Sequence, residues 1–177
     1  MLASGSEPDI GRGFEMTDAE NISFAIVTCS DTRGIDQDAA GDFLEKAIVE
    51  CGWVCRDHSI VKDEIDQIAD AIVRASDKLG CDIVLTCGGT GLSPRDVTPE
   101  ATRKVCDREV PGIAEGMRVH SLKYTSRAML SRALCMQRGS TLVVNLPGST
   151  KAATENWEAI VDVLPHAVSM MAAGGHE

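Results

Sequence analysis

The chain has 177 residues, of which 44% are hydrophobic and 25% are charged. This length and composition are typical of one globular domain with a substantial buried core. The net charge of −10 argues against a nucleic-acid partner, because nucleic-acid binding needs a clustered basic surface. No apolar run is long enough to cross a bilayer, so we expect no membrane partner either.

The seven cysteines form an odd-numbered set without a C-x-x-C pair, and the four histidines show no metal-ligand spacing. Several of the cysteines lie in apolar runs, where a free thiol packs like a small hydrophobic group. The pattern therefore argues against a disulfide or zinc framework. It is consistent with a reducing, cytoplasmic location.

The first patterned segment begins about twenty residues into the chain. Residues 1–20 are rich in Gly, Ser and acidic residues, so we expect a flexible segment there and a single domain over residues 21–177. Residues 23–29 form a short, continuous apolar run that predicts a buried strand. Between residues 37–51 the apolar side chains recur at helical spacing, and Gly52 is placed to end that helix.

Three further elements lead to the centre of the sequence. Residues 53–61 predict a second strand, and the apolar spacing of residues 65–79 predicts a second amphipathic helix that ends at Gly80. Residues 82–87 predict a third strand, which is buried. Thr98 then starts a helix, because its hydroxyl can accept a free backbone amide and the proline after it suits the first turn.

The alternation of strands and helices continues to the C-terminus. Residues 100–139 are expected to be mostly helical, with a break at Pro111. Residues 141–146 predict another buried strand, and a final helical region buries Trp157 and is split by Pro165. Strands that alternate with helices predict a three-layer α/β/α sandwich with a mostly parallel, open sheet.

A glycine-rich turn directly follows the strand expected at residues 82–87. It is not a P-loop, since no Gly-Lys-Ser/Thr follows, and not the dinucleotide fingerprint, since Pro94 stands where the third glycine belongs. Glycines at the carboxyl end of a strand let the backbone approach an anion closely, although a tight turn without a ligand is the alternative. The candidate phosphate-binding residues are Gly88, Gly89, Thr90 and Gly91.

Two acidic residues follow separate strands of the expected sheet. Asp63 lies at the end of the second strand, and Asp96 follows the glycine turn next to Arg95. Two carboxylates at one sheet edge are what a Mg²⁺ ion bridging phosphates requires, and Arg95 adds a cation for the phosphate. Asp63 could equally be the N-cap of the next helix, and Asp96 a solvated loop residue. Our hypothesis is that Asp63 and Asp96 bind Mg²⁺ and serve catalysis.

Two other loops carry polar residues that either bind a ligand or have only a structural role. The pair at residues 30–31 either binds a phosphate or polar ligand group or forms a turn ahead of the first helix. In the loop at residues 147–149, Ser149 either caps the last helix or, with Lys151, helps to form an anion site. The binding candidates in these loops are Ser30, Asp31, Pro147, Gly148 and Ser149.

Together these motifs resemble the MogA/MoaB family of molybdenum-cofactor biosynthesis proteins, which includes the G domain of gephyrin. The likeness runs in the same order over residues 22–165 and looks closest to the MoaB branch at residues 28–30 and 149–151. It is carried by the motifs Cys29-Ser30-Asp31-x-x-Gly34, Asp38-x-x-Gly41, Thr86-x-Gly88-Gly89-Thr90-Gly91, Arg95 to Glu100, Asp107 to Gly112 and Asn145 to Ser149.

This resemblance implies a fold, an activity and an assembly. Active members of the family have a three-layer α/β/α fold, bind molybdopterin and Mg-ATP, and transfer AMP to the terminal phosphate of the pterin with release of pyrophosphate. Asp63 and Asp96 match the two aspartates that the family uses in this reaction. Arg95 or Lys62 would stabilise the departing pyrophosphate. Family members form trimers, or hexamers in the MoaB branch, so a homotrimer or homohexamer is expected.

Two alternative functions stay open. One is a non-catalytic molybdopterin-binding or scaffolding protein of the same pathway, which would bind the ligand without ATP turnover. The other is a hydrolase that uses the same domain, as in CinA proteins, which carry extra domains.

Overall fold

A six-stranded sheet runs through the centre of the protein in the order β2-β1-β3-β6-β5-β4. The computed structural model describes residues 21–32, 34 and 37–173, so the segment expected at residues 1–20 lies outside the described residues. β2, β1, β3 and β6 are parallel, whereas β5 and β4 extend one edge by antiparallel pairing. The strands are β1 Ser23–Cys29, β2 Val54–Val61, β3 Ile83–Cys87, β4 Arg108–Glu109, β5 Cys135–Arg138 and β6 Thr141–Leu146.

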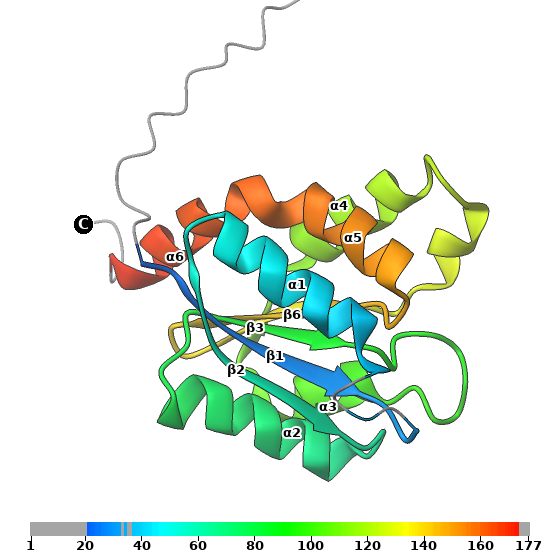
Figure 1. The fold of residues 1–177 in the computed structure, drawn as a ribbon, viewed down its shortest axis with the longest axis horizontal. Coiled ribbons are helices and arrows are strands. Elements are labelled where there is room, and N and C mark those ends of the chain that lie inside the picture. The colour runs from blue at the N-terminus through cyan, green and yellow to red at the C-terminus, as the bar shows by residue number, and fades with distance from the viewer. Residues whose placement is uncertain (1–20, 33, 35–36, 174–177) are drawn as a thin grey trace, which may run out of the picture.

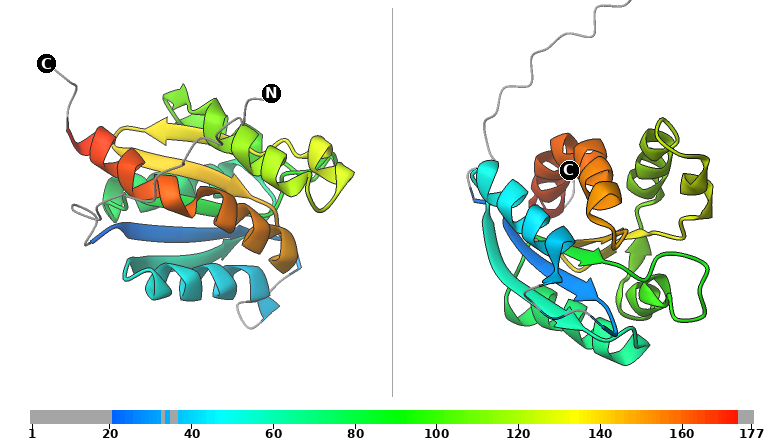
Figure 2. Two further views of the ribbon diagram at one scale, coloured as in Figure 1. Left: turned by 90° about the horizontal axis from the view of Figure 1, so that it is seen from above. Right: turned by 45° about the vertical axis from the view of Figure 1, so that its right-hand side comes forward.

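Helices cover both faces of the sheet (Figure 1; Figure 2). α1, α4, α5 and α6 lie on one face, and α2 and α3 lie on the other. This arrangement confirms the predicted α/β/α sandwich with a mostly parallel sheet. In the part of the chain that the structure describes, no helix is long and apolar enough to pass through a bilayer. The helices are α1 Ala39–Glu50, α2 Ile65–Val73, η2 Arg74–Lys78, α3 Thr98–Val105, α4 Pro111–Ser121, η3 Ser126–Leu130, α5 Thr150–Ile160, η4 Val161–Val163 and α6 Leu164–Ala172.

The three central strands are buried along their whole length. Every residue of β1, β3 and β6 is buried. Uninterrupted burial follows from the helices on both faces, and it explains why continuous apolar runs predicted these strands correctly. Phe24 of β1 anchors one side of the core, because its ring stacks on Trp53 at a centroid distance of 5.4 Å and lies 6.1 Å from Trp157.

Glycine and proline set helix boundaries as the sequence predicted. Gly52 and Gly80 follow the first two helical segments with φ angles of 80° and 59°, in the left-handed region that glycine adopts at low cost. Pro165 lies at the start of α6, and the final helical region is divided into α5, η4 and α6.

The region 100–139 is only partly helical, which corrects the prediction. It contains α3, α4 and η3, but also the strands β4 and β5, of two and four residues. Strands this short show no period in the sequence, and their conformation depends on long-range pairing such as that of Cys135 with Val144. The expected break near Pro111 is the segment between α3 and α4, and Pro111 starts α4 because its missing amide is not needed in the first turn.

A buried cluster of polar groups holds the start of α1. Asp38 is fully buried and accepts hydrogen bonds from the Gly41 amide at 3.1 Å and from the Thr28 hydroxyl. His58 of β2 lies between two carboxylates, with Nε2 3.0 Å from Asp38 and Nδ1 3.0 Å from Glu45. Burial acts to lower the pKa of His58, but hydrogen bonding to Asp38 and Glu45 outweighs it and raises this pKa above 6.5.

The substitution His58→Gln is expected to remove a pH-dependent part of the stability. Because the folded-state pKa of His58 is raised, its contribution is fully present below pH 6.5 and is lost as the pH rises through the folded pKa. Between about pH 6 and about pH 9 the free energy of unfolding of the wild-type protein should fall by about 1 to 2 kcal/mol more than that of the variant. Denaturant titrations across this range measure the difference, and parallel pH profiles would contradict the expectation.

Candidate functional site

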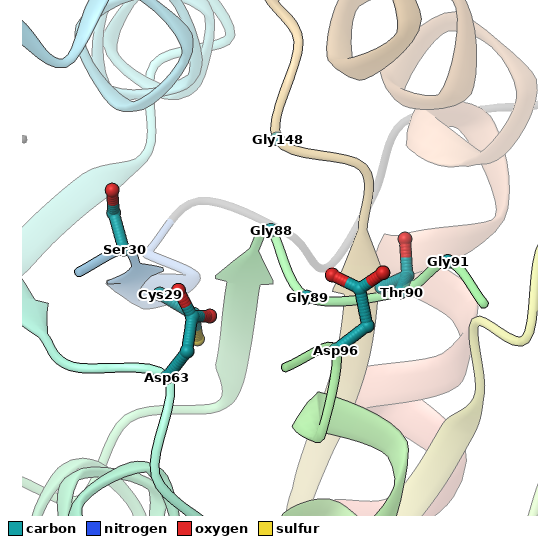
Figure 3. Close-up of a pocket in the computed structure, with 9 residues that line it drawn as sticks. All are labelled: Cys29, Ser30, Asp63, Gly88, Gly89, Thr90, Gly91, Asp96 and Gly148. Carbon is teal, nitrogen blue, oxygen red and sulfur yellow. The ribbon is translucent and has the colours of Figure 1, made fainter. Parts of the chain in front are cut away.

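Loops at the carboxyl ends of four parallel strands enclose a cavity of about 320 Å³ (Figure 3). The loops follow β1, β2, β3 and β6, and open α/β sheets bind their ligands at this edge. All four loops were singled out in the sequence, and the structure brings them together. The residues that line the cavity are Cys29, Ser30, Asp63, Gly88, Gly89, Thr90, Gly91, Asp96 and Gly148.

Two residues of the glycine turn after β3, Gly88 and Gly89, occupy positions that favour a residue without a side chain. Gly88 has a φ of 113°, and a β-carbon there would lie 2.5 Å from the carbonyl oxygen of Cys29. Gly89 has a φ of 64°, also in the left-handed region. Thr98 supports the turn, because its hydroxyl donates a hydrogen bond to the Gly88 carbonyl at 2.8 Å. The predicted N-cap role of Thr98 was wrong: Val97 is the N-cap of α3, and Thr98 is its first residue.

Asp63, in the loop between β2 and α2, keeps one carboxylate oxygen without a partner. Its Oδ2 accepts a hydrogen bond from the Asp31 amide at 3.1 Å, and its own amide donates to Oδ1 of Asp31 at 3.2 Å. Its Oδ1 is buried and has no hydrogen-bond partner among the described residues. Burial, together with the charge of Asp31, raises the pKa of Asp63. The N-cap alternative was wrong, because Glu64 is the N-cap of α2.

Asp96 reaches the same cavity from the loop between β3 and α3. Its Oδ2 accepts a hydrogen bond from the Ser93 amide at 2.9 Å. The same oxygen lies so near Gly91 that a β-carbon there would be 2.8 Å away. In Figure 3, Asp63 lies to the left of Gly88 and Asp96 to its right, next to Gly89 and Thr90. Two acids from separate loops therefore share one cavity, as the sequence led us to expect.

The two carboxylates fit a divalent cation that is bound together with phosphate. Mg²⁺ prefers carboxylate oxygens and keeps waters and phosphate oxygens as its other ligands. A cation at Oδ1 of Asp63 would give that buried oxygen the partner it lacks. Within residues 21–32, 34 and 37–173, no group of three or more His, Cys, Asp or Glu could hold a metal by itself. The donor set therefore suits a metal whose remaining ligands come from a phosphate substrate and water.

Arg95 is engaged by Asp31 and does not line the cavity. Its Nη2 lies 2.9 Å from Oδ1 and 2.7 Å from Oδ2 of Asp31, and its Nε lies 3.1 Å from Oδ2. These hydrogen bonds lower the pKa of Asp31. Because Asp31 also exchanges backbone hydrogen bonds with Asp63, the loop of Arg95 is tied to the loop that carries the first acid.

The remaining candidates have different surroundings. Ser30 and Gly148 line the cavity, whereas Pro147 lines a neighbouring one. Ser149 caps α5, which agrees with the structural alternative for this residue. The side chain of Lys151 is 83% exposed and does not line either cavity.

The neighbouring cavity has a volume of about 390 Å³ and was not predicted. Thr90 and Gly91 line both cavities, so the two adjoin at the glycine turn. The walls of this second cavity come from α4, η3, α5 and the loops at residues 90–92 and 147. These segments are far apart in the sequence, and no local motif links them.

Arg132 positions the loop of Asp96 and was also missed in the sequence. Its Nε donates to the Gly91 carbonyl at 2.7 Å, and its Nη2 donates to the Asp96 carbonyl at 2.5 Å. The same guanidinium forms an ion pair with Glu100 at the start of α3. A single arginine in a loop 36 residues from Asp96 gives no recognisable sequence signal.

A glycine turn with two acids beside it, at the carboxyl edge of a mostly parallel sheet, places this protein among α/β proteins whose loops at that edge form a ligand cavity. Comparison with known proteins gives the family: residues 25–166 match the model described as a probable molybdopterin binding domain. The chain belongs to this molybdopterin-binding family, as its resemblance to the MogA/MoaB proteins indicated.

Named relatives agree with this assignment. The chain is 36% identical over 156 residues to the molybdopterin adenylyltransferase of Helicobacter pylori (strain J99), covering 86% of this chain and 89% of the relative. It is 40% identical over 135 residues to molybdenum cofactor biosynthesis protein B of Bacillus cereus, covering 75% and 80%. The crystal structure of the molybdopterin biosynthesis enzyme MoaB of Thermus thermophilus matches with a TM-score of 0.80 and 44% identity, over 86% of this chain and 97% of that one.

Proposed function

We propose that this protein is a molybdopterin adenylyltransferase, which transfers AMP from Mg-ATP to the terminal phosphate of molybdopterin and releases pyrophosphate. The observation that carries the proposal is the shared cavity of Asp63 and Asp96 beside the glycine turn, with an oxygen on Asp63 that has no partner among the described residues. The name of the Helicobacter pylori relative supports the same activity.

Each part of the site has a role in this reaction. The open surface of the glycine turn would receive a phosphate, and Asp63 and Asp96 would hold Mg²⁺, which would neutralise charge on the phosphate oxygens. An oxygen of the molybdopterin phosphate attacks the α-phosphorus of ATP as the bond from this phosphorus to the bridging oxygen breaks. The electron pair of that bond leaves with pyrophosphate. The protein therefore contributes mainly positioning and charge neutralisation.

Arg95 has a role that depends on releasing Asp31. Both side chains of this ion pair are partly exposed, 59% for Arg95 and 38% for Asp31, so an incoming phosphate can reach the guanidinium. We expect Arg95 to exchange the Asp31 carboxylate for phosphate oxygens and to stabilise the departing pyrophosphate, with Lys62 of the neighbouring loop as the second cation.

The test is direct incubation of the purified protein with molybdopterin and Mg-ATP. Chromatography should detect adenylylated pterin, and a coupled assay should detect an equal amount of pyrophosphate. Molybdopterin binding without either product would contradict the proposal and favour the non-catalytic binding or scaffolding protein. Release of phosphate or AMP without adenylylated pterin would favour a hydrolase.

The substitution Arg132→Lys is expected to lower the rate of AMP transfer about 10- to 100-fold. Lysine keeps the positive charge, but it has no planar guanidinium group that can donate to the carbonyls of Gly91 and Asp96 at the same time. The turnover number should fall more than the affinity for ATP, because the loop is misplaced rather than lost. Arg103→Lys, in the exposed ion pair with Glu109, is the matched control and should retain full activity. Equal rates for both variants would contradict the positioning role.

We also propose that the protein is a cytoplasmic homotrimer or homohexamer. Five large apolar side chains between residues 119 and 130 are exposed, which supports burial against further copies of the chain. They are Val119, Leu122, Tyr124, Met129 and Leu130. None of the seven cysteines, all of which the structure describes, forms a disulfide, which supports a reducing compartment. Light scattering after size-exclusion chromatography measures the assembly, and a monomer at micromolar concentration would contradict it.

A further inference from the structure

The cavity next to the phosphate site has the shape and setting of a ring-binding site. Its volume of about 390 Å³ is in the range of cavities that hold small organic ligands. α4 and α5 pack side by side (Figure 2), and residues of both helices line this cavity. Apolar side chains suited to the faces of a planar ring lie beside polar ones suited to its edges. The residues used below are Leu92, Leu130, Pro147, Arg118, Glu155 and Asn156.

Glu155 of α5 is a largely buried acidic residue whose ion pair among the described residues is long. The residue is 8% exposed, and it lines the cavity. Its one ion pair is a contact of 3.9 Å with Lys151, whose own side chain is 83% exposed. A buried carboxylate is costly unless hydrogen-bond donors satisfy its oxygens, and a long contact to a solvated lysine satisfies them poorly. A ligand with N–H donors would replace solvent at these oxygens with charge-assisted hydrogen bonds.

Two neighbouring donors of the cavity make contacts elsewhere. The Asn156 amide donates to the Ala152 carbonyl at 2.7 Å and to the Ser121 hydroxyl at 3.3 Å. Arg118 donates from Nη1 to the Ala133 carbonyl at 3.0 Å. A ligand edge with N–H groups, bound between the apolar walls, would give the Glu155 carboxylate donors that these two side chains do not supply.

The 2-amino-4-oxo edge of a pterin ring is such a partner. Its ring N3–H and its 2-amino group point in the same direction, so they can donate two parallel hydrogen bonds to one carboxylate. Leu92, Leu130 and Pro147 provide the apolar contacts for the ring. A ring in this cavity can send its phosphate-bearing arm past Thr90 and Gly91, which line both cavities, to the phosphate site.

We propose that Glu155 is the specificity-determining residue for the substrate, and that its carboxylate recognises the 2-amino-4-oxo edge of a pterin ring in the second cavity. The proposal rests on the proposed function, since it assigns a binding site to the ring of the same substrate. It adds the residue that sets the substrate specificity. A ring with N–H donors at this edge should bind. A ring with a carbonyl there should bind weakly, because its oxygen and the carboxylate are both acceptors.

The experiment compares two rings of the same size with two forms of the protein. The probes are pterin and its 2,4-dioxo analogue lumazine, whose own fluorescence reports binding at neutral pH. The wild-type protein should bind pterin about tenfold or more tightly than lumazine. Glu155→Gln should reverse this preference, because the glutamine amide can accept from N3–H and donate to the 2-oxo group. Glu158→Gln, an exposed site on the same helix, is the control and should leave the preference unchanged.

Further results separate this proposal from the proposed function. A wild-type protein without preference for pterin, or equal weakening of both rings by Glu155→Gln, would overturn the role of Glu155 even if AMP transfer is observed. A reversed preference in a protein that transfers no AMP would support the ring site and contradict the enzymatic function. Circular dichroism checks folding, and Glu155→Asp, which keeps the charge on a shorter arm, should weaken pterin binding without reversing the preference.

Discussion

Asp63→Asn is expected to abolish most of the activity and at the same time to stabilise the ligand-free protein. The variant should transfer AMP about 1,000-fold more slowly, because it removes one of two charged ligands from the metal position. Stability should change in the opposite sense. Asp63 has a raised pKa, and its Oδ1 is buried without a hydrogen-bond partner among the described residues, so its ionised form is unfavourable in the folded protein.

The pH dependence of this stabilisation follows from the sign of the pKa shift. A carboxyl group whose folded pKa is raised contributes stability below its unfolded pKa and loses it as the pH rises through the folded pKa. At pH 7 the variant should therefore melt roughly 2 to 4 °C higher than the wild type, which corresponds to about 1 kcal/mol. The gain should fade toward about pH 4, where the wild-type carboxyl is protonated.

Calorimetry without metal or nucleotide, together with the AMP-transfer assay, measures both effects. Asp70→Asn, an exposed change of the same charge on α2, should alter neither the rate nor the pH profile. An Asp63→Asn protein that keeps wild-type activity would end the assignment of Asp63 to the metal. A lower melting temperature at pH 7 would show that the ionised carboxylate is well satisfied.

Gly88→Ala is expected to be among the most destabilising single substitutions in the glycine turn. The φ of Gly88 is 113°, and the added β-carbon would lie 2.5 Å from the Cys29 carbonyl oxygen, a backbone atom that cannot turn away. Backbone strain and steric overlap together should lower the free energy of unfolding by about 3 kcal/mol, which corresponds to a melting temperature roughly 6 to 12 °C lower. Because the turn must then shift, phosphate binding should weaken as well.

Gly139→Ala provides a control for this prediction. Gly139 also has a positive φ, 53°, but a β-carbon there would meet no atom within 4 Å. Its cost should be about 1 kcal/mol, from backbone strain alone. The difference between the two variants in a denaturant titration isolates the contact with Cys29. Similar losses for both would show that the turn relaxes around a methyl group.

Predictions from the sequence were correct where the determinant lies within a few residues. The apolar runs of β1, β3 and β6 indicated strands because helices cover both faces of the sheet. Gly52 and Gly80 were recognised as helix ends because glycine adopts a positive φ at low cost, whatever the distant contacts. The glycine turn after β3 was recognised for the same reason.

Predictions failed where a distant partner decides the outcome. β5 is a strand because it pairs with β6, and its four residues show no period of their own. Thr98 has the residue type of an N-cap, but its hydroxyl bonds to Gly88 in the turn after β3 and leaves the cap position to Val97. Local preference was overridden by tertiary contacts in both cases.

By itself the sequence determined the central strands, the glycine turn and the presence of one acid in each of two loops, because each depends on neighbouring residue types. Only the tertiary structure decided that one oxygen of Asp63 has no partner in the described part of the chain, that Arg132 holds the loop of Asp96, and that Glu155 is buried beside a second cavity. These features depend on the strand order and on helices that pack from distant parts of the chain. Such contacts leave no local pattern in the order of residues.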